Sequence, residues 1–227
     1  MSSSKKLIFT GLYAVGMAYV EAAAVLYLRR AYGIQDLLPT PALYDPALTF
    51  IEVGRESATI LMLISVAWIA GQTLQQRSGY FVYAFGIWDI FYYLWLKLFI
   101  HWPITIMDMD ILFFIPLPWW GPVLAPVLIS LLMIAFGMHL VMQSEYERLV
   151  KFKIHQSFLL CMGILVMLFS FMQDALQALF AGKEVVDLTR PVYFNWIVFL
   201  SGYSLVALIF LHLIQTGTTK KGPSKSQ

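Results

Sequence analysis

The sequence contains little charge and almost no cysteine. Only 12% of its 227 residues are Asp, Glu, Lys or Arg, whereas 60% are hydrophobic. Soluble domains typically carry about 25% charged residues, so we expect an integral membrane protein. The single cysteine, Cys161, excludes an intramolecular disulfide and a cluster of thiolate metal ligands. With a net charge of +2 and no long basic block, the sequence predicts no nucleic acid partner.

Signatures of cofactor chemistry are also missing. The chain has no Walker loop, no dinucleotide-type glycine pattern and no Gly-x-Ser-x-Gly elbow, so we expect no nucleotide to bind by those routes. No histidine has a second His or a Cys three or four positions later, and we predict no metal site and no cofactor. A haem held by His139, His155 and His212 is the alternative, because all three fall near one predicted membrane surface. Three helix ends at one interface would produce the same clustering.

Long hydrophobic runs, by contrast, are abundant. About 20 apolar residues are needed to cross the hydrocarbon core, and six segments qualify, at 7–28, 57–74, 80–101, 120–142, 155–180 and 192–214. The first run is too long for the ~7–15-residue apolar core of a signal peptide, so we predict a retained helix. The sequence therefore predicts an all-α fold, a polytopic transmembrane bundle of about six helices. Residues 1–219 form its single domain and residues 220–227 a disordered basic tail.

Lysines and arginines are distributed unevenly between the two ends of this bundle. More of them fall on the side of the two termini than on the other side. Because cytoplasmic loops carry an excess of these residues, we expect a multi-pass protein of the cell inner (plasma) membrane with both termini cytoplasmic. The connections 29–56 and 102–119 then lie outside, and "MDMDILFFIPLP" is expected to be a re-entrant or surface-lying segment.

Two charges interrupt the aromatic segment "GIWDIFYYLWLKLFIHWP", residues 86–103. Asp89 and Lys97 lie within one predicted span, where a charge at the helix centre costs about 2.5–3.5 kcal/mol. Eight residues correspond to about 12 Å along a helix axis, so the two side chains are too far apart to pair. Each is therefore expected to meet another helix or water.

Other ionisable groups share the middle and outer part of the predicted bundle. If they converge, they form a hydrated, outward-facing pocket of carboxylates and a lysine, suited to acid–base chemistry or to a proton or cation path. The catalytic candidates are Glu21, Arg55, Glu56, Asp89 and Lys97, and the substrate-binding candidates are Tyr92, Tyr93, His101, Asp108, Asp110 and Asp174. We interpret Glu52 as part of a capped helix start. The alternative for the whole set is a polar network that only fixes helix packing.

Three runs carry a resemblance to known sequences: "WDIFYYLWLK", "DILFFIPLPWWGPV" and "VGRESATILMLISVAWIAG". Together they resemble an uncharacterised family of bacterial multi-helix integral membrane proteins, which brings no activity with it. Three functions therefore stay open. We prefer, by a small margin, a non-catalytic accessory subunit of a larger membrane complex. The others are a membrane-embedded enzyme acting on a lipid-like or isoprenoid substrate, and an ion- or proton-coupled carrier or channel. The expected partners are the lipid bilayer and either a lipid-like ligand or that larger complex.

Overall fold

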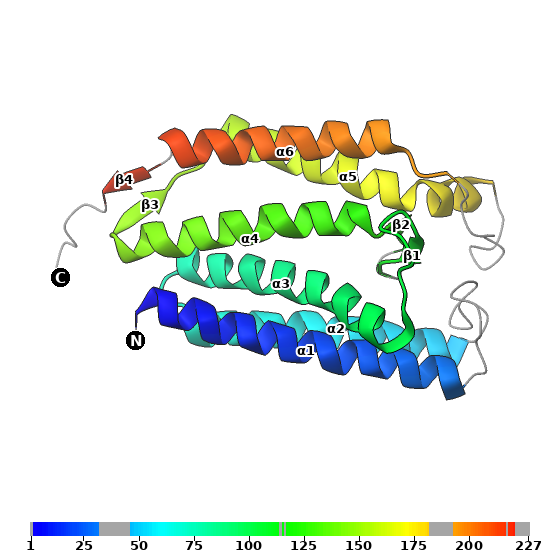
Figure 1. The fold of residues 1–227 in the computed structure, drawn as a ribbon. Helices are drawn as coiled ribbons and strands as arrows, with labels where there is room; N and C mark the ends of the chain where they lie inside the picture. Colours follow the sequence, from blue (N-terminus) through cyan, green and yellow to red (C-terminus); the bar gives the residue numbers. More distant parts are fainter. Residues whose placement is uncertain are drawn as a thin grey trace.

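Six long helices lie side by side in the computed structural model of the protein (Figure 1). The structure describes residues 2–31, 46–113, 115, 117–181, 193–216 and 218–220. The helices are α1 (Ser3–Ala31), α2 (Pro46–Ala70), α3 (Leu74–Ile100), α4 (Leu124–Glu145), α5 (Ile154–Phe180) and α6 (Trp196–Thr216). Each is long and apolar enough to cross a membrane. The predicted all-α fold with six spanning helices is confirmed, and the chain is a multi-pass membrane protein.

The boundaries differ from the apolar segments most clearly at α2. The segment predicted at 57–74 belongs to a helix that begins at Pro46 and ends at Ala70. Thr73 then caps α3, because its hydroxyl accepts a hydrogen bond from the backbone N–H of Gln76 at 3.2 Å. A hydropathy window detects only the part of a helix that is uniformly apolar, so it misses a first half that carries charge.

Helix α3 occupies the centre of the bundle. It packs on α1, α2 and α4, whereas α5 and α6 pack mainly on each other. Figure 1 shows the α5–α6 pair lying along α4, on the side away from α1 and α2. A core that includes Phe136 and Leu140 of α4 and Ile209 and Leu213 of α6 joins the two parts.

Two short antiparallel strand pairs close the ends of the bundle. Strand β1 (Met109–Ile111) pairs with β2 (Trp120–Pro122) between α3 and α4, and β3 (Arg148–Val150) pairs with β4 (Thr218–Lys220). Figure 1 shows the start of α1 and strand β4 on the side of β3, opposite β1 and β2. The segment expected to be re-entrant or surface-lying thus contains one strand of a hairpin. Within the predicted basic tail, Lys220 ends β4, and residues 221–227 lie outside the described part of the chain.

Glycines allow α3 and α4 to approach each other closely. A Cβ atom added at Gly137 of α4 would lie 2.6 Å from the carbonyl oxygen of Gly79 and 2.6 Å from the backbone nitrogen of Tyr83, both on α3. A Cβ atom added at Gly86 of α3 would likewise lie 2.6 Å from the carbonyl oxygen of Ser130 on α4. Small residues at such crossings let helices pack in lipid, where the hydrophobic effect does not drive association.

We therefore expect Gly137→Ala to force α3 and α4 apart. The free energy of unfolding should fall by about 1–3 kcal/mol, the usual cost of overpacking, and thermal unfolding of the purified protein in detergent measures it. Gly16→Ala is the control, because a Cβ there meets no atom within 4 Å. Equal effects of the two substitutions would contradict the close α3–α4 contact.

Candidate functional site

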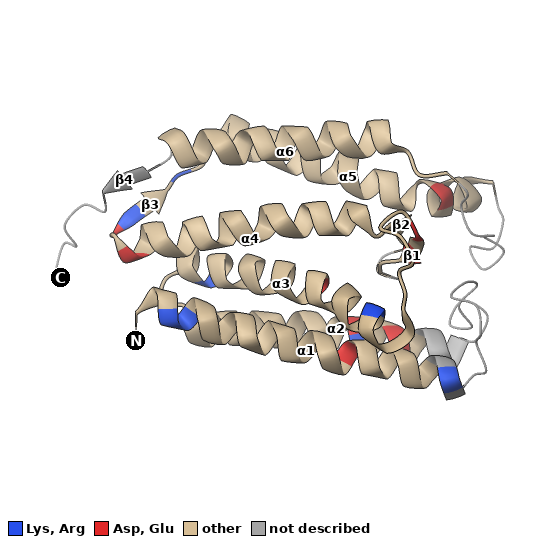
Figure 2. Ribbon diagram, in the orientation of Figure 1, with Lys and Arg blue, Asp and Glu red and all other residues tan. Residues whose placement is uncertain are grey.

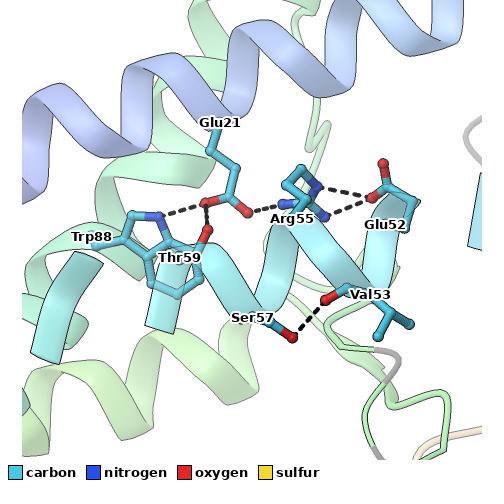
Figure 3. A network of polar contacts seen from close by, with 7 residues as sticks. All are labelled: Glu21, Glu52, Val53, Arg55, Ser57, Thr59 and Trp88. Carbon is cyan, nitrogen blue, oxygen red and sulfur yellow. Dashed lines mark hydrogen bonds and ion pairs between the residues drawn. The ribbon is translucent and has the colours of Figure 1, made fainter. Parts of the chain in front are cut away.

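The carboxylate of Glu21 joins three helices. It projects from α1 and accepts hydrogen bonds from Arg55 and Thr59 of α2 and from the indole N–H of Trp88 of α3 (Figure 3). The Thr59 hydroxyl lies 3.1 Å and the Trp88 nitrogen 2.9 Å from the same carboxylate oxygen. Only 9% of Glu21 is exposed. Charge-assisted hydrogen bonds of this kind are stronger than neutral ones, so this carboxylate links α2 and α3 to α1.

Arg55 lies between two carboxylates. Its guanidinium pairs with Glu21 on one side, and on the other it donates two hydrogen bonds to Glu52, at 2.9 and 2.7 Å (Figure 3). Glu52 and Arg55 are three residues apart on α2, a spacing that puts both on one helix face. Glu52 is buried and lies six residues inside the helix, so its interpretation as part of a helix start is wrong.

A polar cavity of about 40 Å³ opens beside this network. The hydroxyl of Tyr93 donates a hydrogen bond to Asp110 of β1 at 3.2 Å, which connects α3 to the strand hairpin at the cavity wall. Seven of the eleven predicted site residues meet here. The lining residues are Glu21, Arg55, Glu56, Thr59, Trp88, Asp89, Tyr92, Tyr93, Asp110, Ile111, Leu112 and Phe113.

Asp89 borders a second cavity as well. Its carboxylate accepts a hydrogen bond from the Ser130 hydroxyl of α4 at 2.8 Å, and only 9% of the residue is exposed. The second cavity, of about 80 Å³, is almost entirely apolar; it is lined by Asp89 with Phe85, Leu112, Phe113, Trp119, Pro126, Ile129, Ser130 and Phe171. Asp89 therefore lies where a polar and an apolar cavity adjoin, near the middle of α3.

Four predicted site residues lie outside both linings. Lys97 is exposed near the end of α3, and its ammonium group donates to the carbonyl oxygen of Pro103 at 2.6 Å. Lys97 therefore does not line the pocket in which we expected a lysine, and the lining cation is Arg55, another predicted candidate. Lysines near a helix C-terminus bond the last free carbonyls, and this local partner explains the position of Lys97. The other three are His101, which is exposed, Asp108, which accepts from the backbone N–H of Ile104 at 2.7 Å, and Asp174, half-buried on α5.

The three histidines of the alternative haem site lie on α4, α5 and α6. Within the described residues, no group of three or more His, Cys, Asp and Glu side chains is arranged to hold a metal ion. The haem ligation stays a prediction, as does the absence of any other cofactor.

The sequence did not predict four residues that belong to the site: Glu52, Thr59, Trp88 and Ser130. A signal existed for two of them. Thr59 follows Arg55 by four residues and so shares its helix face, and Trp88 directly precedes Asp89 in the sequence. No signal in the sequence pointed to Ser130, because its contact with Asp89 joins residues that are 41 positions apart.

The arrangement can bind ligands and move protons. Carboxyl groups can accept and donate protons, and Arg55 can hold a developing negative charge. Asp89 and Asp110 each contact a hydroxyl group, from Ser130 and Tyr93 respectively, at the wall of one cavity. Acid–base chemistry at Asp89 is therefore available to a molecule that enters either cavity.

Comparison with known proteins assigns no activity. No family model, no curated protein and no solved structure matches the chain. The resemblance to bacterial multi-helix membrane proteins stays a prediction, and the role of each residue follows from the geometry alone.

We expect Glu21→Ala to cost about 3 kcal/mol of stability, because it leaves the guanidinium of Arg55 without one of its two carboxylates. The double variant Glu21→Ala/Arg55→Met should lose less than the sum of the two single variants, since each single variant already removes the one Glu21–Arg55 interaction. Chemical unfolding of the four proteins measures this coupling. Additive losses would show that Glu21 and Arg55 do not interact.

Proposed function

We propose that the protein binds a lipid-like molecule across the two adjoining cavities. The polar end of that molecule lies in the cavity formed by α1, α2, α3 and β1, and its apolar part in the cavity between α3, α4 and α5. The observation that carries this proposal is that Asp89, Leu112 and Phe113 line both cavities. A ligand placed there would have to contain a polar and an apolar part next to each other.

The sizes of the cavities restrict the ligand. One water molecule needs at least about 10–15 Å³ of such volume, so the polar cavity, about 40 Å³, holds roughly three waters. The apolar cavity, about 80 Å³, holds roughly twice as much. Five of its nine lining residues are only half-buried. We infer that a long chain would extend from this cavity into the surrounding lipid.

This geometry supports a ligand site better than the accessory-subunit hypothesis. A network that only fixes helix packing needs no cavity beside its charged groups, whereas here seven carboxylate, guanidinium and hydroxyl side chains of α1, α2 and α3 line one. A carrier would need a polar path across the whole bundle, whereas the polar cavity has room for only about three waters. A lipid-modifying enzyme fits the same site, with Asp89 as its acid–base group.

We further propose that the chain lies in a bacterial inner membrane with both termini cytoplasmic. The positive-inside rule supports this orientation, and the start of α1 and strand β4 lie at the same end of the bundle (Figure 1). Figure 2 shows most acidic residues toward the opposite end. The acidic cavity would then open toward the periplasmic half of the membrane.

A substitution in the apolar cavity tests the binding proposal. Ile129→Trp places a larger side chain in that cavity, so we expect the lipid that co-purifies with the full chain to fall at least ten-fold, as measured by native mass spectrometry. Leu131→Trp is the matched control, since Leu131 lies two positions along α4 and is 53% exposed.

Thermal unfolding of both tryptophan variants confirms that they remain folded. Equal lipid occupancy in the wild-type protein and in a folded Ile129→Trp variant would contradict the proposal. So would wild-type protein that carries no lipid after extraction in a mild detergent and exposure to a total lipid extract.

A further inference from the structure

We infer that the polar cavity recognises a compact organic cation, so that the ligand carries an ammonium head group. This inference rests on the proposed function and names the chemical class of the ligand's polar end. Three properties of the cavity lead to it: the sign of its charged lining, its aromatic walls and its volume.

The charged lining is predominantly acidic. Glu21, Glu56, Asp89 and Asp110 line the cavity, and all four are at least about nine-tenths buried. Arg55 is the cation among these lining residues, and its guanidinium is engaged by Glu21 and Glu52. Charges interact strongly at low dielectric, so a phosphate or carboxylate head group would be repelled here and a cation attracted.

The aromatic walls favour an organic cation over a metal ion. Trp88, Tyr92, Tyr93 and Phe113 line the same cavity. The rings of Tyr92 and Tyr93 meet edge to face with centroids 5.2 Å apart, and those of Trp88 and Phe113 lie 6.3 Å apart. Aromatic faces attract ammonium groups, and cages of such rings bind quaternary ammonium ligands. Metal ions instead need several oxygen ligands in a regular array, and the described residues contain no such group of His, Cys, Asp and Glu.

The volume selects a small head group. Room for about three waters accommodates a primary to quaternary ammonium group but not a complete phosphocholine. Asp89 would lie beside the nitrogen, and carbon atoms attached to that nitrogen would continue past Leu112 and Phe113 into the apolar cavity. The predicted ligand class is therefore an alkylamine or alkylammonium amphiphile.

Choline and its uncharged analogue 3,3-dimethyl-1-butanol, which have the same shape, provide the test. The full chain in a non-ionic detergent is titrated with each compound by isothermal calorimetry, at an ionic strength held constant with potassium chloride. We expect choline to bind at least ten-fold more tightly than the alcohol. We also expect Asp110→Asn to weaken choline binding at least ten-fold, because it removes a carboxylate from the cavity wall.

Asp174→Asn is the matched control, since Asp174 lies on α5 outside both cavity linings; this variant should bind choline as the wild type does. Equal binding of choline and the alcohol would overturn the inference, as would equal losses in the two variants when thermal unfolding shows both to be folded. In another outcome, choline fails to bind while a neutral lipid still binds to the wild type and is lost from the Ile129→Trp variant. That result would overturn the cation inference and leave the proposed function standing. If neither binds, both fall.

Discussion

The ion pair between Glu21 and Arg55 is the interaction on which the half of the bundle next to β1 and β2 depends. Two charges within spanning helices are unfavourable unless they are paired and fully hydrogen-bonded. The Glu21 carboxylate meets this requirement with three donors from two other helices. Because Arg55 and Thr59, four residues apart on one face of α2, both donate to Glu21 of α1, α2 is fixed in rotation as well as in position. This orientation places Glu56 and Thr59 at the cavity wall.

The polar network and the glycine contacts have complementary effects on α3. On the side of this helix that faces α4, Gly79 and Gly86 allow the two backbones to approach each other closely. On the other side, larger side chains and the strand hairpin hold α1, α2 and α3 around a cavity. Asp89 lies between these two environments and is held by Ser130. The close α3–α4 contact thus positions the carboxylate that both cavities share.

Much of the fold could be predicted from the sequence because a membrane-spanning helix leaves a local signal, a run of apolar residues. The sequence allowed the convergence of Glu21, Arg55, Glu56, Asp89 and Asp110 but did not determine it, because spacing along one helix does not fix which faces of different helices meet. Lys97 was misplaced because carbonyl groups a few residues away satisfy it, a local competitor that spacing alone does not reveal. The β1–β2 hairpin was missed because three-residue strands show no clear alternation. The Ser130 contact depends on the distance between two helices, which no single segment determines.

The most direct test of the account is electron cryomicroscopy of the full chain in lipid nanodiscs, at a resolution that shows side chains. The account predicts that Glu21 lies within hydrogen-bonding distance of Arg55, Thr59 and Trp88. It also predicts non-protein density that runs past Asp89 from the polar cavity into the apolar one. Separated Glu21 and Arg55 side chains, or cavities filled by the protein's own side chains, would contradict it.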